Sequence, residues 1–386
     1  MSTDVIRIIL VITYWLFHKF PVKNKIVFAS NNAAVLQGNM KYIYDEWSAS
    51  GGNNKVKLLL YESRNTTIGK MKHLIHMIKS VYHLSTSKYF IVDDYYYPIY
   101  VIKPKKQVCI IQVWHACGAF KKFGYSLMDK SYGATKEFVQ KVKIHSNYNY
   151  ALVSSENVAD IYSNAFHMDK KRIISIGIPR TDIFFNKDKI EGIQKNLYEK
   201  YPQLKGSKVI LFAPTFRGDS KFRASSDYLP DFYKLFAALK SEYKIIIKLH
   251  PFVSKEFAVV PEMQDFIIDL SSYEDINELM FISELLITDY SSVIFEYALL
   301  EKPMIFYAPD LNTYLHERDF YYDYEEFVPG PITKDTQGLI KIIKNGSYDL
   351  RRITLFKNEF FDYQDGKSSQ RFVKMLLNQI DGGCNE

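Results

Sequence analysis

The sequence predicts an α/β protein built from two doubly wound parallel sheets that face each other across a central cleft. Short β-branched or aromatic runs alternate with helical patterns along most of the chain, which is typical of parallel sheets covered by helices on both faces. A length of 386 residues is enough for two such domains. Hydrophobic residues make up 47 % and charged residues 24 %, which is ordinary for a globular protein and excludes disordered, collagen-like and polytopic membrane proteins.

Residues 1–24 form a segment of their own. Residues 5–17 are nearly all apolar, and Lys19, Lys23 and Lys25 follow them. A membrane-spanning helix needs about 20 apolar residues, so this run is too short to cross, and it lacks the small-residue cleavage site of a signal peptide. We expect a helix that lies in the membrane interface, with Trp15 and the lysines at the level of the headgroups. The alternative is an ordinary N-terminal helix packed on the domain.

The first domain is predicted over residues 25–195. Helical patterns, for instance at 39–48 and 132–142, separate its candidate strands, which are 25–30, 55–61, 89–94, 108–114 and 150–155. A polar, Lys-rich stretch at 187–207 fits a connector between the halves.

The second domain is predicted over residues 196–386, with a last helix that either stays there or crosses back to the first domain. Its candidate strands are 208–214, 243–251, 266–270, 285–290 and 303–309. Because ligands of such sheets bind beyond the carboxyl ends of the strands, the residues that follow each strand are the informative ones.

Two strands of the second half are followed directly by polar side chains. Thr215 and Arg217 stand after the first strand, and His250 stands after the second. Each has a structural alternative, since a Thr-Phe-Arg-Gly stretch is often only a loop and a histidine after a strand is often a buried structural residue.

A third strand end adds a helix start. Ser291 and Ser292 follow the strand at 285–290, where hydroxyls and free backbone N–H groups can hold a phosphate. Glu296 lies about one turn further along, where a carboxylate can accept hydrogen bonds from ribose hydroxyls. Two serines before an apolar run are usually only an N-cap. The three strand ends taken together predict a site for a nucleotide diphosphate.

The first half offers one strong candidate, His115, at the end of the strand at 108–114. An imidazole titrates near neutrality and can take a proton from an attacking hydroxyl. Glycines that allow close backbone approach and lysines that can meet phosphate charge follow it, namely Gly118, Lys121, Lys122 and Gly124. The alternative is a buried histidine beside a solvated lysine pair. Asp93 and Asp94 are interpreted as a turn at the rim of the cleft rather than as metal ligands.

Other chemistries are disfavoured by what the sequence lacks. It contains no Walker or dinucleotide-type glycine loop, which argues against ATPases and dehydrogenases. The three cysteines fit neither a zinc site nor a disulfide framework, so we expect a reducing, cytoplasmic setting. A net charge of +7 favours anionic partners. Nucleic acid is not expected among them, because no basic helix or aromatic-interleaved Lys/Arg patch is present.

An ordered set of motifs resembles the CDP-glycerol glycerophosphotransferases of wall teichoic acid synthesis. The motifs extend over nearly the whole chain: VWHACGAFKKFG (113–124), GIPRTDIFF (177–185), FAPTFRG (212–218), KLHP (248–251), DINELM (275–280), TDYSSVIFEYALLEKPMIFYAPD (288–310), RDFYYDYEEFVPGP (318–331) and DGKSSQR (365–371). The resemblance implies the two-lobed GT-B fold, an acceptor-side first domain, a CDP-binding second domain and peripheral attachment to the cytoplasmic face of the membrane.

The resemblance also implies an activity, the transfer of glycerol phosphate from CDP-glycerol to an undecaprenyl-diphosphate-linked saccharide with release of CMP. His115 then becomes the general base and His250 lies near the donor phosphates. The predicted ligands of the donor are Thr215, Arg217, Ser291, Ser292, Glu296 and Arg318. No cofactor other than the donor substrate and no metal are expected, because positioning and charge stabilisation can carry phosphoryl transfer.

Subtype and rivals stay open at this point. WHACGAFKK in place of WHG followed by TPLKK looks closer to primase-like members, and the length agrees with that. CDP-ribitol as donor, a capsular polymer as product and a homo-oligomeric assembly are alternatives. The rival functions are a glycosyltransferase of the same fold that uses a nucleotide sugar and a non-catalytic scaffold at the membrane surface.

Overall fold

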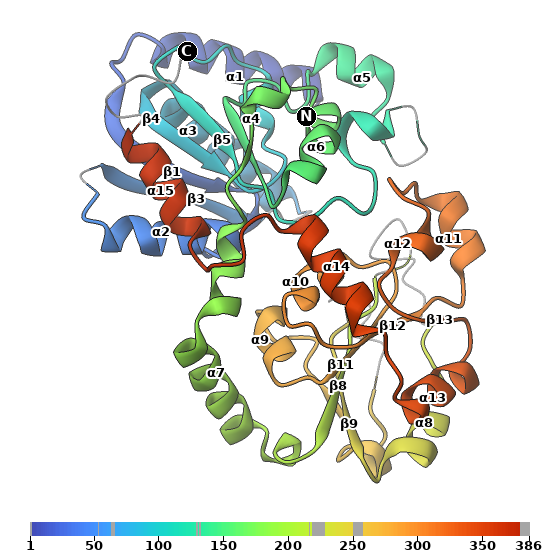
Figure 1. Cartoon of the computed structure of the whole chain (residues 1–386). Coiled ribbons are helices and arrows are strands. Elements are labelled where there is room, and N and C mark those ends of the chain that lie inside the picture. Colours follow the sequence, from blue (N-terminus) through green and yellow to red (C-terminus); the bar gives the residue numbers. More distant parts are fainter. Residues whose placement is uncertain are drawn as a thin grey trace. The chain divides into compact units, whose positions relative to one another are not determined.

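The computed structural model describes residues 2–52, 54–62, 66–128, 130, 133–215, 217, 228–249 and 258–378. The chain divides into two compact units (Figure 1). Unit 1 comprises Met1–Asp182 and Phe361–Glu386, and unit 2 comprises Ile183–Phe360. The first unit therefore ends at Asp182, whereas the sequence analysis placed the boundary after residue 195. Each unit contains one parallel or mostly parallel sheet, which confirms the predicted α/β class.

The sheet of unit 1 has the order β2-β3-β1-β4-β5-β6-β7. Every neighbouring pair is parallel except β2 with β3. The strands are β1 (Lys23–Ser30), β2 (Asn32–Ala33), β3 (Lys55–Glu62), β4 (Ser87–Val92), β5 (Cys109–Gln112), β6 (Tyr150–Val153) and β7 (Ile173–Ser175). Because helices cover both faces, the central strands are continuous apolar runs, which is why the sequence marked them.

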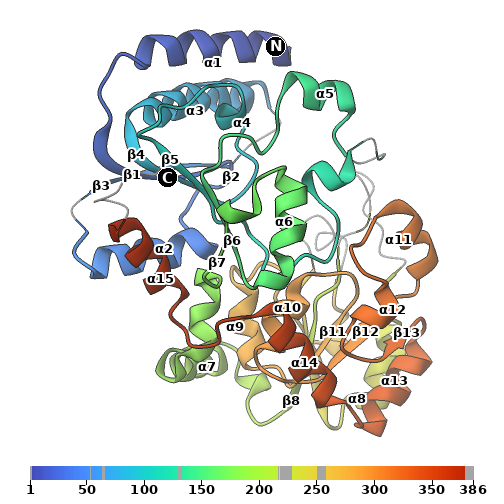
Figure 2. The ribbon, with the colours of Figure 1, turned by 45° about the horizontal axis from the view of Figure 1, so that its top comes forward.

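Helices cover the two faces of this sheet in two pairs (Figure 2). On one face α1 and α3 pack with Leu10 and Val81 against Val27 and Phe90. On the other face α2 and α15 pack against the alternate side chains of the same strands. The helix α15 comes from the end of the chain and lies beside α2. The helices of unit 1 are α1 (Thr3–Phe17), α2 (Gly38–Ala49), α3 (Thr67–Thr86), α4 (Tyr97–Tyr100), α5 (Lys136–Lys141), α6 (Ala159–Phe166) and α15 (Ser368–Asn378).

The sheet of unit 2 is parallel throughout, with the order β10-β9-β8-β11-β12-β13. Its strands are β8 (Lys208–Phe212), β9 (Tyr243–Ile247), β10 (Ile267–Asp269), β11 (Leu285–Thr288), β12 (Met304–Tyr307) and β13 (Ile332–Thr333). On one face α8 and α13 cover the strands with Leu235, Leu239 and Leu339. The helices are α7 (Lys187–Lys200), α8 (Phe232–Leu239), α9 (Ile276–Phe281), α10 (Val293–Ala298), α11 (Leu311–Glu317), α12 (Tyr324–Phe327), α13 (Thr336–Asn345) and α14 (Leu350–Phe360).

All ten strands expected from the sequence are present, and the differences lie in short or polar elements. The strands β2, β7 and β13 have only two or three residues each, too few to give a pattern. The stretch at 187–207, expected as a connector, carries the helix α7, whose first turn is capped by the side chain of Asn186. None of the helices in the described ranges combines the length and the apolar character that crossing a bilayer requires.

Candidate active site

The carboxyl end of β5 carries His115 on a turn that is held in an unusual conformation. Trp114 has a φ of 47°, in the left-handed region that costs a bulky side chain about 1–2 kcal/mol. The backbone N–H of Trp114 donates to Oε1 of Gln112 at 2.9 Å. Nδ2 of Asn39, on α2, donates to the carbonyls of Val113 and Trp114 at 2.8 and 2.9 Å. These hydrogen bonds fix the direction in which the chain leaves the strand, and with it the position of His115.

The ring of His115 is oriented by the end of the neighbouring strand β4. Its Nδ1 lies 3.2 Å from the carbonyl oxygen of Asp93 and 3.8 Å from Oδ2 of Asp94. A carbonyl oxygen only accepts, so Nδ1 carries the proton and the lone pair lies on Nε2. The ring stacks on Trp114 with 4.4 Å between centroids, and its side chain is 54 % exposed. His115 is thus an accessible imidazole whose tautomer leaves Nε2 as a proton acceptor.

Asp93 and Asp94 were interpreted from the sequence as a simple turn, and the structure gives Asp94 a more specific place. Its carboxylate faces His115 and accepts hydrogen bonds from the Asn32 amide and from the backbone N–H of Tyr95. Burial, with the adjacent Asp94 charge, raises the pKa of Asp93 to about 6. The signal that could have identified Asp94 is its position directly after a strand, but only the sheet order shows that this strand neighbours β5.

In unit 2 several residues predicted to bind the CDP donor lie at the carboxyl edge of the sheet. Thr215 follows β8 and Ser291 follows β11, and these two strands are neighbours. The backbone N–H of Thr215 donates to Oδ1 of Asp289 at 2.7 Å, which ties the two strand ends together. The Oγ1 of Thr215 is buried and has no hydrogen-bond partner among the described residues. Ser292 directly precedes the short helix α10 without capping it through its side chain.

Arg217 is engaged by two carboxylates. Its Nη1 lies 2.8 Å from Oδ2 of Asp289 and donates to the carbonyl of Thr215 at 2.7 Å. Nε and Nη2 donate to the two carboxylate oxygens of Asp310 at 2.6 and 3.0 Å. Three of its five N–H groups therefore donate hydrogen bonds to described residues, and Nη1 also forms an ion pair with Asp289. The contact of Arg217 with the phosphate of the CDP donor stays a prediction.

The other predicted residues are more scattered. Glu296 is buried on α10, with 2 % of its surface exposed. Arg318 directly follows α11, and its backbone N–H donates to the carbonyl of Tyr314 at 2.8 Å. His250 lies outside the described residues. Within the described ranges, no three His, Cys, Asp or Glu side chains gather into a group that could hold a metal ion.

Comparisons with known proteins point to one family. The sequence profile of the CDP-glycerol:poly(glycerophosphate) glycerophosphotransferases matches residues 12–378. The teichoic acid ribitol-phosphate primase of Bacillus spizizenii is 41 % identical over 95 % of this chain and 94 % of that protein. The poly(ribitol-phosphate) polymerase of the same species is 43 % identical, but the match covers 58 % of that protein's length. The glycerol-phosphate primase of Bacillus subtilis is 32 % identical over 89 % of this chain.

Solved structures give the same picture. The wall teichoic acid polymerase TagF superposes with a TM-score of 0.78 and 26 % identity, over 95 % of this chain and 93 % of that one. A TagF variant soaked with CDPG superposes with a TM-score of 0.76. This likeness confirms the GT-B fold class that the sequence predicted.

Proposed function

The chain belongs to the CDP-glycerol:poly(glycerophosphate) glycerophosphotransferase family, and from that premise we propose that it transfers an alditol phosphate from a CDP-alditol to a lipid-linked saccharide and releases CMP. The observation that carries this proposal is the contact between Nδ1 of His115 and the carbonyl oxygen of Asp93 at 3.2 Å. The Nδ1 proton is held by the Asp93 carbonyl beside Asp94, so Nε2 is the atom that can accept a proton from the acceptor.

The proposed step is a direct displacement at phosphorus. The acceptor hydroxyl attacks the phosphorus that bears the alditol, its proton passes to Nε2 of His115, and the bond from that phosphorus to the CMP oxygen breaks. CMP leaves with the bonding electron pair. The hydroxyls of Thr215, Ser291 and Ser292, with His250 and Arg318, stabilise the charge on the phosphates, and Glu296 accepts from the ribose.

In this proposal the donor is CDP-ribitol. The sequence analysis had expected CDP-glycerol and kept CDP-ribitol as an alternative. The support is the degree of similarity, because the ribitol-phosphate primase is 41 % identical to this chain and the glycerol-phosphate primase is 32 % identical. In this proposal the chain adds the first unit or units, because its WHACGAFKK motif looks closer to the motif of primase-like members.

The acceptor is an undecaprenyl-diphosphate-linked saccharide, and the enzyme works as a peripheral protein on the cytoplasmic face of the membrane. Support for the membrane contact comes from α1, which exposes apolar side chains along its outer face, among them Ile8, Ile12 and Trp15. The product belongs to wall teichoic acid or a related polymer.

Donor and acceptor are tested together in one assay. CMP release is measured from CDP-ribitol and, separately, CDP-glycerol, with a lipid-linked disaccharide as acceptor and mass analysis of the product. We expect faster release with CDP-ribitol and a mass increase of one or a few ribitol phosphate units. Faster release with CDP-glycerol would make glycerol phosphate the transferred group, as the sequence analysis expected. No release of CMP from either donor, together with formation of a glycoside from an added nucleotide sugar, would replace the reaction by sugar transfer.

The general base is tested with His115→Asn, which keeps the size of the side chain and removes its basicity. Loss of general base catalysis lowers the rate by about 10²–10⁴-fold. The matched control is His167→Asn, because His167 is exposed on α6's C-cap with a φ of 52°, a conformation that asparagine tolerates. Full activity of folded His115→Asn protein contradicts the assignment.

A further inference from the structure

The ends of two neighbouring strands meet at the ring of His115. β4 and β5 run parallel with Val92 beside Gln112, and the backbone N–H of Val113 donates to the carbonyl of Val92 at 2.8 Å. Because this pairing continues to the last residue of both strands, the residues that follow β4 lie beside those that follow β5. Asp94 is thereby brought to the Nδ1 side of the ring, where its Oδ2 lies 3.8 Å from Nδ1.

The carboxylate of Asp94 is held by hydrogen-bond donors on both of its oxygens. Its Oδ1 accepts from the backbone N–H of Tyr95 at 2.6 Å. Its Oδ2 accepts from the side-chain amide of Asn32, which stands two residues beyond the end of β1, the strand on the other side of β4. Both donors are neutral groups, so they fix the carboxylate without cancelling its charge. The Asp94 side chain is only 26 % exposed, which limits the screening of that charge by water.

A buried amide ties the backbones of the two strand ends together. Nε2 of Gln112 donates to the backbone carbonyl of Asp94 at 3.1 Å and to the hydroxyl of Tyr148 at 3.0 Å. Oε1 of the same side chain accepts from the backbone N–H of Trp114 at 2.9 Å. One fully buried side chain therefore holds both the residue that carries the carboxylate and the residue before His115. Separating the two would leave buried polar atoms of this amide without partners, so their spacing is fixed.

The neighbouring Asp93 contributes to the same ring in a different way. Its backbone carbonyl accepts the Nδ1 proton at 3.2 Å, whereas burial raises the pKa of its carboxyl group to about 6. On the ring's own segment the basic residues are Lys121 and Lys122, six and seven positions further on, and α2 brings only the neutral amide of Asn39 to this turn. Asp93 therefore sets the tautomer through its backbone, and the side-chain carboxylate at the ring is that of Asp94.

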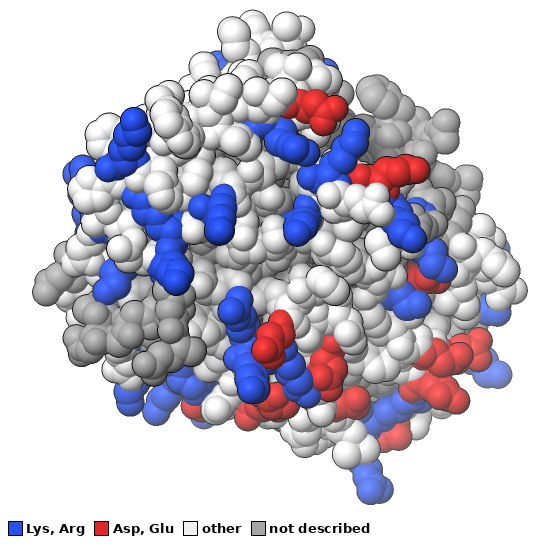
Figure 3. All heavy atoms as spheres, turned by 90° about the horizontal axis from the view of Figure 1, so that it is seen from above, with Lys and Arg blue, Asp and Glu red and all other residues white. Residues whose placement is uncertain are grey.

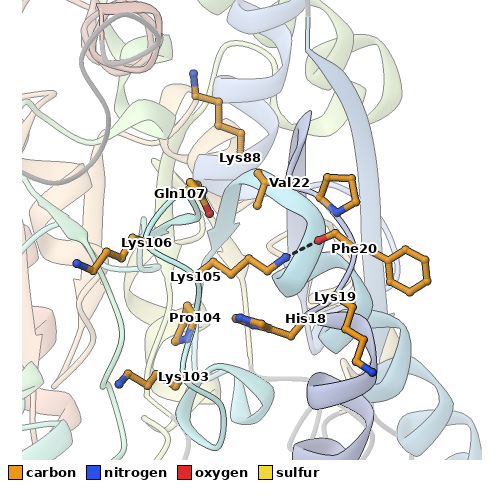
Figure 4. A pocket seen from close by; sticks show the side chains of 11 residues that line it. His18, Lys19, Phe20, Val22, Lys88, Lys103, Pro104, Lys105, Lys106 and Gln107 are labelled. Atoms are coloured by element: carbon orange, nitrogen blue, oxygen red, sulfur yellow. Dashed lines mark hydrogen bonds between the residues drawn. The ribbon is translucent and has the colours of Figure 1, made fainter.

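The lysines at the opposite edge of the sheet lie too far away to neutralise this carboxylate. A groove of about 1050 Å³ at the amino ends of β4 and β5 is lined by five lysines, among them Lys88 and Lys105 (Figure 4). Lys88 and Asp94 stand six positions apart along β4 and the residues after it, a separation of roughly 20 Å. The Debye length at physiological ionic strength is about 8 Å, so the amines of the groove have little effect on Asp94.

We propose that Asp94 is a positioning residue for His115, and that its carboxylate stabilises the imidazolium that forms when Nε2 takes the proton of the acceptor hydroxyl. The inference rests on the proposed function and names the group that supports the proposed base.

The carboxylate acts through its charge and takes no proton itself. As the acceptor oxygen attacks phosphorus, its proton moves to Nε2 of His115, while the Nδ1 proton stays on the ring and faces the Asp93 carbonyl. The ring then carries a full positive charge, and the negative charge of Asp94 lies 3.8 Å from Nδ1. Because the positive charge develops only as the proton is transferred, the carboxylate favours the transition state over the bound substrates. Its removal should therefore lower kcat more than it affects the KM for the donor.

The kinetic test compares CMP release by the full chain and by Asp94→Asn, with a water-soluble, short-chain analogue of the lipid-linked disaccharide. Lipid is left out because Figure 3 shows an uncharged area bordered by Lys and Arg side chains, and adsorption to lipid would change the local acceptor concentration. We expect kcat to fall by about 10–100-fold, with the KM for the donor within about twofold of wild type. The matched control is Asp45→Asn, which removes an exposed carboxylate from α2 in the same unit and should leave kcat unchanged.

A double-mutant cycle shows whether Asp94 acts through His115. In the His115→Asn background the imidazole is absent, so adding Asp94→Asn should change kcat by less than about twofold. The same loss in both backgrounds would overturn the proposal, because it would show that Asp94 supports the fold rather than the base. Wild-type kcat in folded Asp94→Asn protein would overturn it as well. Folding of each variant is checked by the urea midpoint of tryptophan fluorescence.

The His115 ring gives a second readout that needs no turnover. In the full chain labelled with nitrogen-15 histidine, its resonances are those missing from the spectrum of His115→Asn. A charged ring is less stable without the carboxylate, so the pH at which these resonances shift should be lower in Asp94→Asn than in the wild type and in Asp45→Asn. An unchanged titration would overturn the proposal. If the wild type releases no CMP from either CDP-alditol, the proposed function fails, and the titration still decides whether Asp94 acts on the ring.

Discussion

Replacing Arg217 with methionine should destabilise unit 2 strongly, although it changes only one side chain. In the wild type the guanidinium is 9 % exposed and lies between Asp289, which is 1 % exposed, and Asp310. These three residues stand at the ends of three consecutive strands of the sheet, β8, β11 and β12. The substitution leaves two carboxylates near each other without the cation that pairs them.

The magnitude follows from that uncompensated charge. Removing one partner of a buried ion pair costs about 3–5 kcal/mol, and the lower end applies here because Asp310 is 29 % exposed. For a unit of this size about 3 kcal/mol lowers the unfolding temperature by roughly 6–12 °C. The aromatic rings of Tyr228, Tyr290 and Tyr314 lie within 4.8 Å of the guanidinium carbon, so their cation–π contacts are lost as well.

The pH dependence gives an independent check. Burial raises the pKa of Asp310, but the hydrogen bonds and charge of Arg217 outweigh it and hold that pKa below its usual value. A carboxylate of this kind adds stability above its unfolded pKa and loses it as the pH falls through the folded one. The wild type therefore loses this contribution below about pH 4, whereas Arg217→Met has already lost it. The difference in stability between the two proteins should narrow on acidification.

The assay separates the two units. All three tryptophans, Trp15, Trp47 and Trp114, belong to unit 1, so tryptophan fluorescence during urea unfolding follows that unit. Hydrogen exchange of the amides in β8, β11 and β12 follows unit 2. We expect faster exchange in unit 2 of the variant and an unchanged fluorescence midpoint.

A charge-balanced variant keeps the reasoning testable. Arg217→Met combined with Asp289→Asn and Asp310→Asn removes the stranded charges, so it should recover part of the lost stability. Wild-type exchange rates in the single variant, or a further loss in the triple variant, would refute the view that this ion cluster ties the three strand ends together.

The remaining predictions concern unit 1 and a pair of glycines. Asn39→Ala removes the hydrogen-bond donor of the Val113 and Trp114 carbonyls at the end of β5. The free energy of unfolding of unit 1 should fall by about 1–3 kcal/mol, and the rate of CMP release should fall as well. An unchanged urea midpoint of unit 1 contradicts this prediction. Burial lowers the pKa of His76 to about 4 and that of His145 to about 3, below the values of these side chains in the unfolded chain. Unit 1 should therefore lose stability as the pH falls from 6.5 toward 4, by about 2 kcal/mol per histidine at pH 5. A urea midpoint of tryptophan fluorescence that stays constant over this pH range contradicts the prediction. Gly177→Ala should lower the free energy of unfolding, because φ of Gly177 is +84° and a Cβ there would lie 2.3 Å from a side-chain oxygen at the start of α15. Gly192→Ala lies in open space on α7 and should raise the free energy of unfolding by up to about 1 kcal/mol. Thermal unfolding checks both, and a stabilised Gly177→Ala with a destabilised Gly192→Ala contradicts the reasoning.

The positions of the main strands could be predicted from the sequence because strands buried on both faces are read as unbroken apolar runs. The polar residues after those runs, such as His115 and Thr215, could be identified for the same reason. Their partners could not. Asp289 and Asp310 are 72 and 93 positions from Arg217, and nothing local to any of the three residues indicates the contact. The sequence analysis accordingly assigned Arg217 to the donor.

The sequence does not reveal the order of the strands, and that order changes the interpretation of residues at the edges of the unit 1 sheet. In a parallel sheet all carboxyl ends meet at one edge and all amino ends at the other. Because β4 and β5 are neighbours, the Asp94 carboxylate and the His115 ring lie side by side, whereas the sequence analysis described a turn and a separate histidine. By the same rule, Lys88 at the start of β4 and Lys106 before β5 line one groove. The partners of a residue therefore depend on which strand lies beside its own, and its place in the sequence does not reveal them.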